Sequence, residues 1–149
     1  MRLLIQRVLQ ASVEIDQKQV AKIEQGVLLF VGICEEDDLA DCDFLAEKVA
    51  KMRIFNDEDG VMNLSVKDVD GGVLVVSQFT LMASTKKGNR PSYIKAAPPE
   101  ISVPLYEAFL KSMSTSLGKN VEHGIFGADM KVNLINDGPV TIWMDTKEK

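Results

Sequence analysis

The sequence predicts an α+β fold, with a strongly bent, barrel-like and mostly antiparallel sheet and two main helices packed outside it. About eight segments read as strands, either because apolar residues alternate with polar ones or because an apolar run is continuous. Two longer segments carry apolar residues at helical spacing. The strands gather towards both ends of the 149-residue chain, which favours this fold class. We expect one domain that spans residues 1–149.

The first half of the chain supplies strands at 3–8, 12–16 and 20–24, followed by a continuous apolar run at 27–33. Such a run is typical of a central strand that is covered on both faces. Asp37 or Asp38 can then cap a helix. The apolar stripe of this helix comprises Leu39, Cys42, Leu45, Ala46, Val49 and Met52. Seven acidic residues lie between positions 35 and 47, and we expect them on the solvent side of the helix.

The second half begins with a short strand at 53–55 and a turn at 56–60, which lacks the closing glutamate of a calcium loop. A strand at 73–76 and a polar loop at 83–93 precede a second helix. Its apolar stripe is Tyr106, Phe109, Leu110, Met113 and Leu117, and Gly118 ends it. Further strands are expected at 121–126, 130–134 and 140–145. The last two flank Gly138-Pro139, where we expect a turn, although the proline removes a backbone donor.

Several kinds of protein are disfavoured by composition. No apolar run approaches the roughly 20 residues that a membrane span needs, and the first residues do not read as a signal peptide. We therefore expect a cytoplasmic protein without a membrane partner. Cys34 and Cys42 match no metal or redox spacing and are expected to be buried thiols. His123 is the single histidine, so we expect a structural or surface role for it, and neither a metal site nor a cofactor.

The charge of the chain is unevenly distributed. A net charge of −5 by itself argues against nucleic acid. Residues 71–99, however, contain no acidic residue and four basic ones, namely Lys86, Lys87, Arg90 and Lys95. The pattern fits either a solvated basic loop or an edge that contacts an anion.

The sequence lacks the common hydrolase, zinc-protease, phosphate-loop and dinucleotide motifs. It does contain an apolar strand that ends in hydroxyl and amide side chains, in VVSQFTL. Free backbone N–H groups at such a strand end could hold an oxyanion. Serine and threonine at strand ends are also ordinary turn formers, so both interpretations stay open from the residues alone.

Over essentially its whole length the sequence resembles the D-aminoacyl-tRNA deacylases, once called D-tyrosyl-tRNA deacylases. The similarity runs through QRVLQASVEID, GVLLFVGI, KMRIFNDEDGVMNLSV, VLVVSQFTLMA, KGNRPSY and FGADMKVNLINDGPVTIWMD. Two pieces are diagnostic together: SQFT at 77–80 and N-x-G-P-V-T at 136–141. The resemblance implies an enzyme that hydrolyses the ester joining a D-amino acid or glycine to the 3′ end of tRNA, including glycine mischarged on alanine tRNA.

The resemblance also implies a homodimer whose active sites lie at the subunit interface. Residues 77–80 of one subunit would meet the Gly138-Pro139 loop of the other, and the family's Gly-Pro bond is cis. Two backbone carbonyls would then exclude an L-side chain and leave space for the hydrogen of a D-residue or of glycine. The implied catalytic residues are Thr80 and Phe79, through their backbone N–H groups, with Ser77 and Gln78. The implied substrate-binding residues are Gly138, Pro139, Arg7 and Met130, with Arg7 holding the loop.

Two reaction schemes fit these residues. The Thr80 hydroxyl could attack the ester and form an acyl-enzyme, but the sequence supplies no base nearby. We favour the alternative, in which the N–H groups of Phe79 and Thr80 hold the oxyanion while water attacks with help from the 2′-hydroxyl of the terminal adenosine. Lys86, Lys87 and Arg90 would contact phosphates of the tRNA acceptor end without reading its sequence. No DNA partner is expected.

Three other functions compete with this one. A sister deacylase of the same fold, with a trans Gly-Pro bond, would clear L-threonyl-tRNA mischarged on alanine tRNA. A non-catalytic module would merely bind the acceptor end of tRNA. A small-ligand barrel would show no dependence on tRNA.

Overall fold

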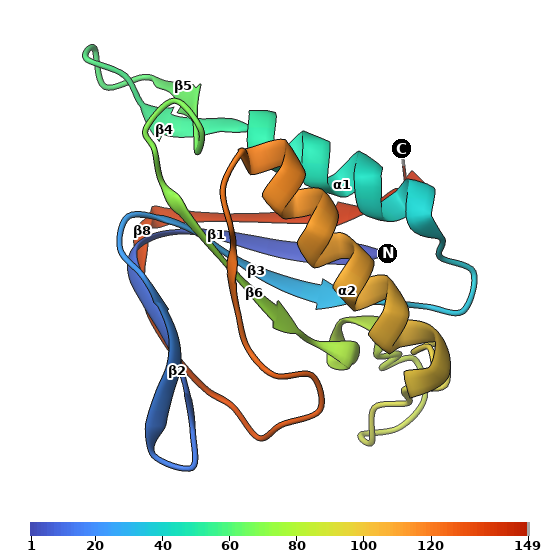
Figure 1. Cartoon of the computed structure of the whole chain (residues 1–149). Helices are drawn as coiled ribbons and strands as arrows, with labels where there is room; N and C mark the ends of the chain where they lie inside the picture. Colours follow the sequence, from blue (N-terminus) through green and yellow to red (C-terminus); the bar gives the residue numbers. More distant parts are fainter. Residues whose placement is uncertain (149) are drawn as a thin grey trace.

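The computed structural model describes residues 1–148 and contains a six-stranded mixed sheet, a small two-stranded sheet and two α-helices (Figure 1). In the large sheet the strand order is β2-β1-β3-β6-β7, and β8 pairs with the other edge of β1. Its strands are β1 (Arg2–Ile15), β2 (Lys18–Ile23), β3 (Gly26–Gly32), β6 (Gly72–Ser77), β7 (Glu122–His123) and β8 (Lys131–Asp145). The small sheet pairs β4 (Arg53–Asn56) with β5 (Met62–Ser65).

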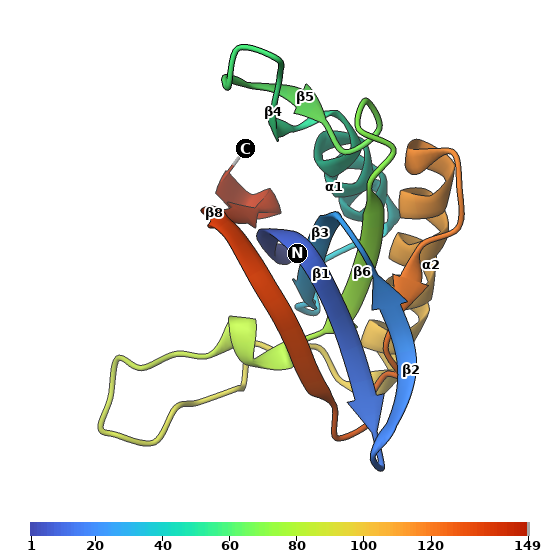
Figure 2. The same ribbon diagram turned by 90° about the vertical axis from the view of Figure 1, so that its left-hand side faces the viewer.

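The bend of the sheet comes from β1, which is one 14-residue strand where the sequence suggested two. Residues 2–8 of β1 pair with β3, and residues 11–15 pair with β2 along the same edge. The opposite edge of β1 is followed by β8 over almost its full length. Figure 2 shows β1 between β8 and β2, with β2 beside the lower half of β1. The prediction of a strongly bent α+β sheet is confirmed.

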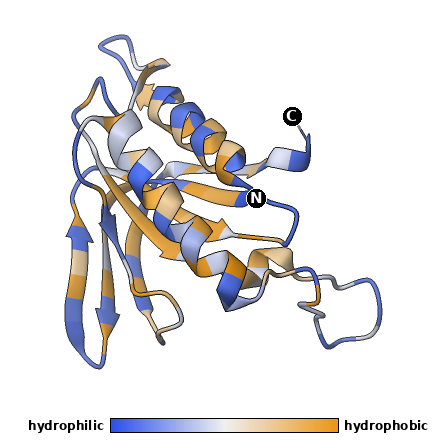
Figure 3. Ribbon diagram, turned by 45° about the vertical axis from the view of Figure 1, so that its right-hand side comes forward, coloured by the Kyte–Doolittle hydropathy of each residue, from blue (hydrophilic) through white to orange (hydrophobic). Residues whose placement is uncertain are grey.

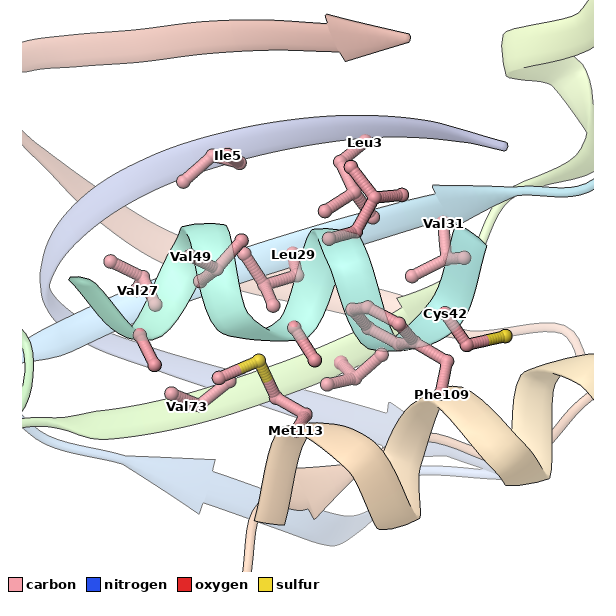
Figure 4. Packing of buried hydrophobic residues seen from close by; sticks show 14 of the residues in the cluster. Leu3, Ile5, Val27, Leu29, Val31, Cys42, Val49, Val73, Phe109 and Met113 are labelled. Atoms are coloured by element: carbon pink, nitrogen blue, oxygen red, sulfur yellow. The ribbon is translucent and has the colours of Figure 1, made fainter. Parts of the chain in front are cut away.

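Both faces of the central strands β3 and β6 are buried, as the continuous apolar run of β3 predicts. One face packs beneath helices α1 (Leu39–Lys51) and α2 (Pro99–Leu117). Figure 4 shows Phe109 and Met113 of α2 pointing towards α1 and the strands beneath it. The other face, with Leu28 and Leu74, packs inside the fold made by β1 and β2. Figure 3 shows the same division, with orange strands inside and blue outer turns on the helices.

Helix α1 begins where the sequence suggested, because Asp38 is its N-cap and forms a capping box with Asp41. The expectation that the acidic cluster is wholly on the solvent side is wrong for two members. Asp41 is buried at this cap, and Asp37 is buried because its carboxylate binds the α-ammonium of Met1 and the N–H of Cys34. Buried acids are acceptable only with such partners.

Two strands differ from their predictions. The strand expected at 121–126 is only β7: the N–H of Gly124 still donates to the carbonyl of Val75, and the chain then enters a turn in which Ala128 donates to the carbonyl of Ile125. Strand β5 was not predicted; its exposed residues carry a weak alternating pattern. The large sheet is mostly antiparallel, as predicted, although β3 pairs with β6 and β6 with β7 in parallel. Helix α2 agrees with the prediction and ends at Gly118, whose φ of 82° is left-handed. Within residues 1–148, no helix has the length and apolar character to cross a membrane.

Candidate active site at the end of strand β6

A cavity of about 470 Å³ lies where β3 and β6 end. One side is formed by the ends of these strands, from Val31 and from Val76 to Phe79. The segment from Phe126 to Met130 forms another side, and the start of α2, including Ser102, contributes a third. Among the residues that line it, Asp129 alone is charged. The cavity is therefore mainly apolar, and its polar groups are concentrated at the strand end.

The chain turns sharply at this strand end. The N–H of Gln78 still donates to the carbonyl of Val31, at 2.7 Å, and then a 3-10 helix, η1, runs from Phe79 to Met82. Gln78 is the N-cap of η1 but makes no side-chain cap. The first N–H groups of a helix have no acceptor within it. The N–H groups of Phe79 and Thr80 are thus adjacent donors at the start of η1; Phe79 lines the cavity, whereas Thr80 follows it and is not among the lining residues.

The Thr80 hydroxyl accepts a hydrogen bond from the Nε2 of Gln78. A carboxamide is not a base, so this contact does not activate the hydroxyl for attack. His123 contacts the carbonyl of its neighbour Gly124, at 2.7 Å, and is exposed at the surface. The geometry therefore offers main-chain donors rather than an activated nucleophile.

The two cysteines are not nucleophiles of this site. Burial raises the pKa of the Cys42 thiol to about 12, and the nearby carboxylates of α1 act in the same direction. Cys34 is half-buried, and burial raises its pKa as well. Both are protonated at neutral pH, and a protonated thiol is a weak nucleophile. In the part of the chain that the structure describes, no group of three or more His, Cys, Asp or Glu residues is placed to hold a metal ion.

Gly138 and Pro139 do not form the expected turn between two strands. They lie within β8, which continues on both sides of them because β1 is long enough to pair with both halves. Val8 is opposite Asn136 and Gln6 is opposite Thr141, so four residues of β8, from Asp137 to Val140, face one residue of β1. This insertion is a large bulge. The Gly138-Pro139 peptide bond within it is cis, and both residues are exposed.

Arg7 is the residue of β1 that faces the bulge, and its side chain is buried. Its Nη1 donates to the carbonyl of Ile54, at 2.7 Å. Its Nε contacts Asp137 twice, at 3.3 Å to the carbonyl oxygen and 3.1 Å to the carboxylate Oδ2. A Cβ built on Gly138 would lie 3.0 Å from Nη2 of Arg7. Arg7 thus contacts the Gly-Pro segment, which is where the family resemblance places it.

Sequence reasoning did not assign roles to Gln6, Asn136 and Thr141, which hydrogen bond to one another at the base of the bulge. Asn136 and Thr141 belong to the motif at 136–141. Their position as polar residues inside an otherwise apolar strand could have indicated a role in hydrogen bonding. Met130, by contrast, was predicted and lines the cavity.

The predicted site residues fall into two groups that one subunit keeps apart. Ser77 is level with Val31 of β3, and therefore with Leu3 of β1, whereas the bulge is level with Arg7. Gly138, Pro139 and Arg7 do not line the cavity.

The basic residues lie in a loop that extends away from the body of the protein (Figures 2 and 3). Ser84 and Ser92 close the base of this loop with two backbone hydrogen bonds, of 2.8 and 2.9 Å. Lys86, Lys87 and Arg90 are exposed, and none has an ion-pair partner within residues 1–148. The loop joins the site through its last residues, since the Tyr93 ring meets the Phe79 ring edge-on at 5.1 Å.

Fold and site together define a small α+β protein with a mainly apolar cavity at a strand end and a backbone bulge outside the lining of that cavity. The chain belongs to the D-Tyr-tRNA(Tyr) deacylase family, whose sequence model matches residues 4–145. A D-aminoacyl-tRNA deacylase of Flavobacterium psychrophilum is 61% identical over 149 residues, which cover 100% of this chain and 99% of the relative. The relative of the same name from Porphyromonas gingivalis is 60% identical, with the same coverage.

Solved structures that this chain resembles include the following two. A protein titled c-Myc DNA Unwinding Element Binding Protein has a TM-score of 0.93 and 36% identity, covering 98% of this chain and 99% of its own. A probable eukaryotic D-amino acid tRNA deacylase has a TM-score of 0.82, covering 96% of this chain and 97% of its own. At 16% identity the second likeness concerns the fold alone.

Proposed function

We propose that this protein hydrolyses the ester bond of D-aminoacyl-tRNA and of glycyl-tRNA, and releases free tRNA and the amino acid. The observation that carries the proposal is the full-length identity of about 60% with relatives named for D-aminoacyl-tRNA deacylation. The site agrees with that activity, because an ester hydrolase needs donors for an oxyanion next to a cavity for the acyl group. We assign the activity to residues 1–149 as a single domain. An aminoacyl-tRNA substrate also supports a cytoplasmic location.

Water is the attacking nucleophile in the reaction that we propose. It adds to the ester carbonyl while the N–H groups of Phe79 and Thr80 donate to the developing oxyanion. The 2′-hydroxyl of the terminal ribose accepts a proton from the water and passes its own proton to the 3′-oxygen, whose bond to the acyl carbon breaks; the released carboxylic acid then ionises in solvent. This scheme needs no protein base, which agrees with a Thr80 hydroxyl bound to an amide. The protein contributes geometry and main-chain dipoles.

The active site is completed, in this proposal, by a second copy of the chain. Gly138 and Pro139 do not line the cavity of their own subunit, which supports a bulge contributed to that cavity by a partner. Strand β8 has a partner on one edge only among the described residues, and Ile135 and Trp143 on it are 47% and 45% exposed. A long, partly apolar open edge is a usual place for another chain to bind.

Selection between mirror-image substrates then depends on backbone atoms. Carbonyl oxygens of the partner's Gly138 and Pro139 would stand where the side chain of an L-residue has to go, and would accept a hydrogen bond from the substrate amino group. Backbone cannot rotate aside as a side chain can, so this form of rejection suits an enzyme that must leave L-aminoacyl-tRNA intact. The exposed position of both residues supports the assignment.

Lys86, Lys87 and Arg90 are proposed to bind phosphates of the acceptor end. They are exposed, free of ion pairs within the described residues, and connected to the cavity through the contact of Tyr93 with Phe79. Phosphate contacts do not depend on base identity, which lets one enzyme accept many tRNAs.

The decisive assay compares D-tyrosyl-, L-tyrosyl-, glycyl- and L-threonyl-tRNA, the last charged on alanine tRNA, with the enzyme far below the substrate concentration. We expect multiple turnovers with the first and third. Faster release of L-threonine would identify the sister deacylase, and binding without release would identify a tRNA-binding module. Sedimentation should give a dimer; a monomer with full discrimination between D and L would contradict the shared site.

A further inference from the structure

The side chain of Asn136 occupies an unusual position at the start of the bulge in β8. Its Nδ2 donates to two backbone carbonyls, that of Arg7 at 3.0 Å and that of Val140 at 3.1 Å. Its Oδ1 accepts from Nε2 of Gln6, at 3.2 Å, and from Oγ1 of Thr141, at 3.0 Å. A carboxamide has two N–H donors and an oxygen with two lone pairs. All four capacities of Asn136 are therefore used within the fold.

The bulge explains why a side chain is needed there. Where four residues of β8 face one residue of β1, the regular backbone ladder is interrupted, and carbonyls on both strands lose their usual partners. Nδ2 of Asn136 supplies hydrogens to a carbonyl on each strand. One of these carbonyls belongs to Val140, the last residue of the insertion. Asn136 itself immediately precedes Asp137, the first residue of the insertion. The amide therefore joins the two ends of the inserted segment and fixes the width of its base.

The oxygen of Asn136 is fixed by residues on both strands. Gln6 lies on β1 and Thr141 on β8, and these two residues are paired across the ladder. Gln6 Nε2 is also 3.4 Å from Oγ1 of Thr141. The amide is thus held in one orientation, with its N–H groups directed at the carbonyls. A carboxylate of the same shape offers no hydrogen and would face both carbonyls with negative charge.

We propose that Asn136 is a positioning residue for discrimination between D- and L-aminoacyl groups: it fixes the base of the bulge, and thereby the position of the Gly138 and Pro139 backbone that enters the neighbouring site. This proposal rests on the function proposed above. Arg7 contacts the segment at Asp137 and Asn136 holds its two ends, so the two side chains constrain different parts of the same insertion.

The test is the ratio of kcat/KM for D-tyrosyl-tRNA to that for L-tyrosyl-tRNA. Asn136→Asp should lower this ratio by about 10- to 100-fold, the range expected when a group at an active site is displaced by about 1 Å. Asn63→Asp is the matched control, because Asn63 lies on β5, away from the strand proposed to bind the partner, is exposed, and makes no side-chain hydrogen bond within the described residues. It should leave the ratio unchanged.

A purely structural role would lower both rates together with the melting temperature and leave their ratio within about twofold of wild type, and that result would overturn the proposal. If Asn136→Asp does not fold, variants of the exposed residue Thr141 test the proposal instead. Thr141→Val removes a hydroxyl that orients the amide and should lower the ratio, whereas Thr141→Ser should retain it. Equal ratios for Val and Ser would also overturn the proposal. A wild-type protein without activity on D-tyrosyl-tRNA would instead refute the proposed function itself.

Discussion

The strand end at residues 77–80 and the bulge at 137–140 are held in place by different interactions. The strand end follows β6, whose residues from Val73 to Val76 are buried on both faces of the sheet. The bulge lies on β8, an edge strand with alternating exposed residues, and depends on polar contacts from Arg7 and Asn136. Core packing thus positions the proposed oxyanion donors, and a few hydrogen bonds position the segment proposed to select the substrate. Rate and selectivity should therefore respond to different substitutions.

The largest effect should come from removing one main-chain donor at the strand end. Phe79→Pro deletes the N–H of the first residue of η1, a position where the fixed φ of proline is compatible with a helix. We expect kcat for D-tyrosyl-tRNA to fall by about 10²- to 10³-fold, as in other oxyanion sites. Single-turnover deacylation measures this directly.

The control for that substitution is Phe79→Leu, which keeps the N–H but removes the ring that contacts Tyr93. It should lose far less activity than Phe79→Pro. If the two variants were equally impaired, with circular dichroism showing both folded, the side chain rather than the backbone would be the important group.

The bulge should respond in selectivity. Gly138 has a φ of 114°, and an added Cβ would lie 3.0 Å from both Arg7 Nη2 and Val140 Cγ2. Gly138→Ala should therefore shift the segment and lower the ratio of D- to L-tyrosyl-tRNA hydrolysis by about 10- to 100-fold. Gly60→Ala is a matched control, because Gly60 has a φ of 75° but nothing within 4 Å of the added atom. An unchanged ratio in Gly138→Ala would show that the bulge does not determine the selectivity for D-aminoacyl groups.

A smaller effect, on affinity and its salt dependence, is expected from the basic loop, which belongs to neither region. Replacing Lys86, Lys87 and Arg90 with alanine should reduce the slope of log affinity against log salt by about 2, at about 0.7 per phosphate of a single strand. The ratio of D to L hydrolysis should stay constant. Lys48→Ala with Lys51→Ala, on α1, should leave the slope unaltered. A slope that is flat in the wild type would refute the phosphate contacts.

The smallest effect is expected from Thr80→Ala, which removes the hydroxyl that Gln78 contacts but keeps the N–H. Most of the deacylation rate should remain, within about a factor of five, since a neutral side-chain hydrogen bond contributes only about 1 kcal/mol. A collapse of the rate, with the melting temperature and tRNA binding retained, would favour an acyl-enzyme on Thr80.

Local patterns were sufficient for elements whose signals lie within a few residues. The end of α2 at Gly118 and the buried run of β3 were predicted correctly, and Asp38 was one of the two residues predicted to cap α1. Predictions were wrong where a distant segment decides the outcome. The Gly-Pro pair resembles a turn, but β1 pairs with the chain on both sides of it and makes it a bulge. Asp37 resembles a surface acid, but the folded chain brings the α-ammonium of Met1 to it.

The site shows the same division. The residues of both motifs, from Ser77 to Thr80 and from Asn136 to Thr141, could be identified from the sequence, because their order and spacing are specific to a family. Their contacts could not. The hydrogen bonds of Asn136 to the carbonyls of Arg7 and Val140 depend on a strand register that joins residues about 130 positions apart.

The sequence by itself determined the fold class, the family and the residues of both motifs, because periodicity, capping and motif spacing are local properties of the chain. The tertiary structure decided that η1 begins beside a cavity, that β8 bulges opposite Arg7, and that these features lie on separate parts of one subunit. Those outcomes depend on which strands pair and in what register. Register is set by burial and by neighbouring strands, which no local pattern contains.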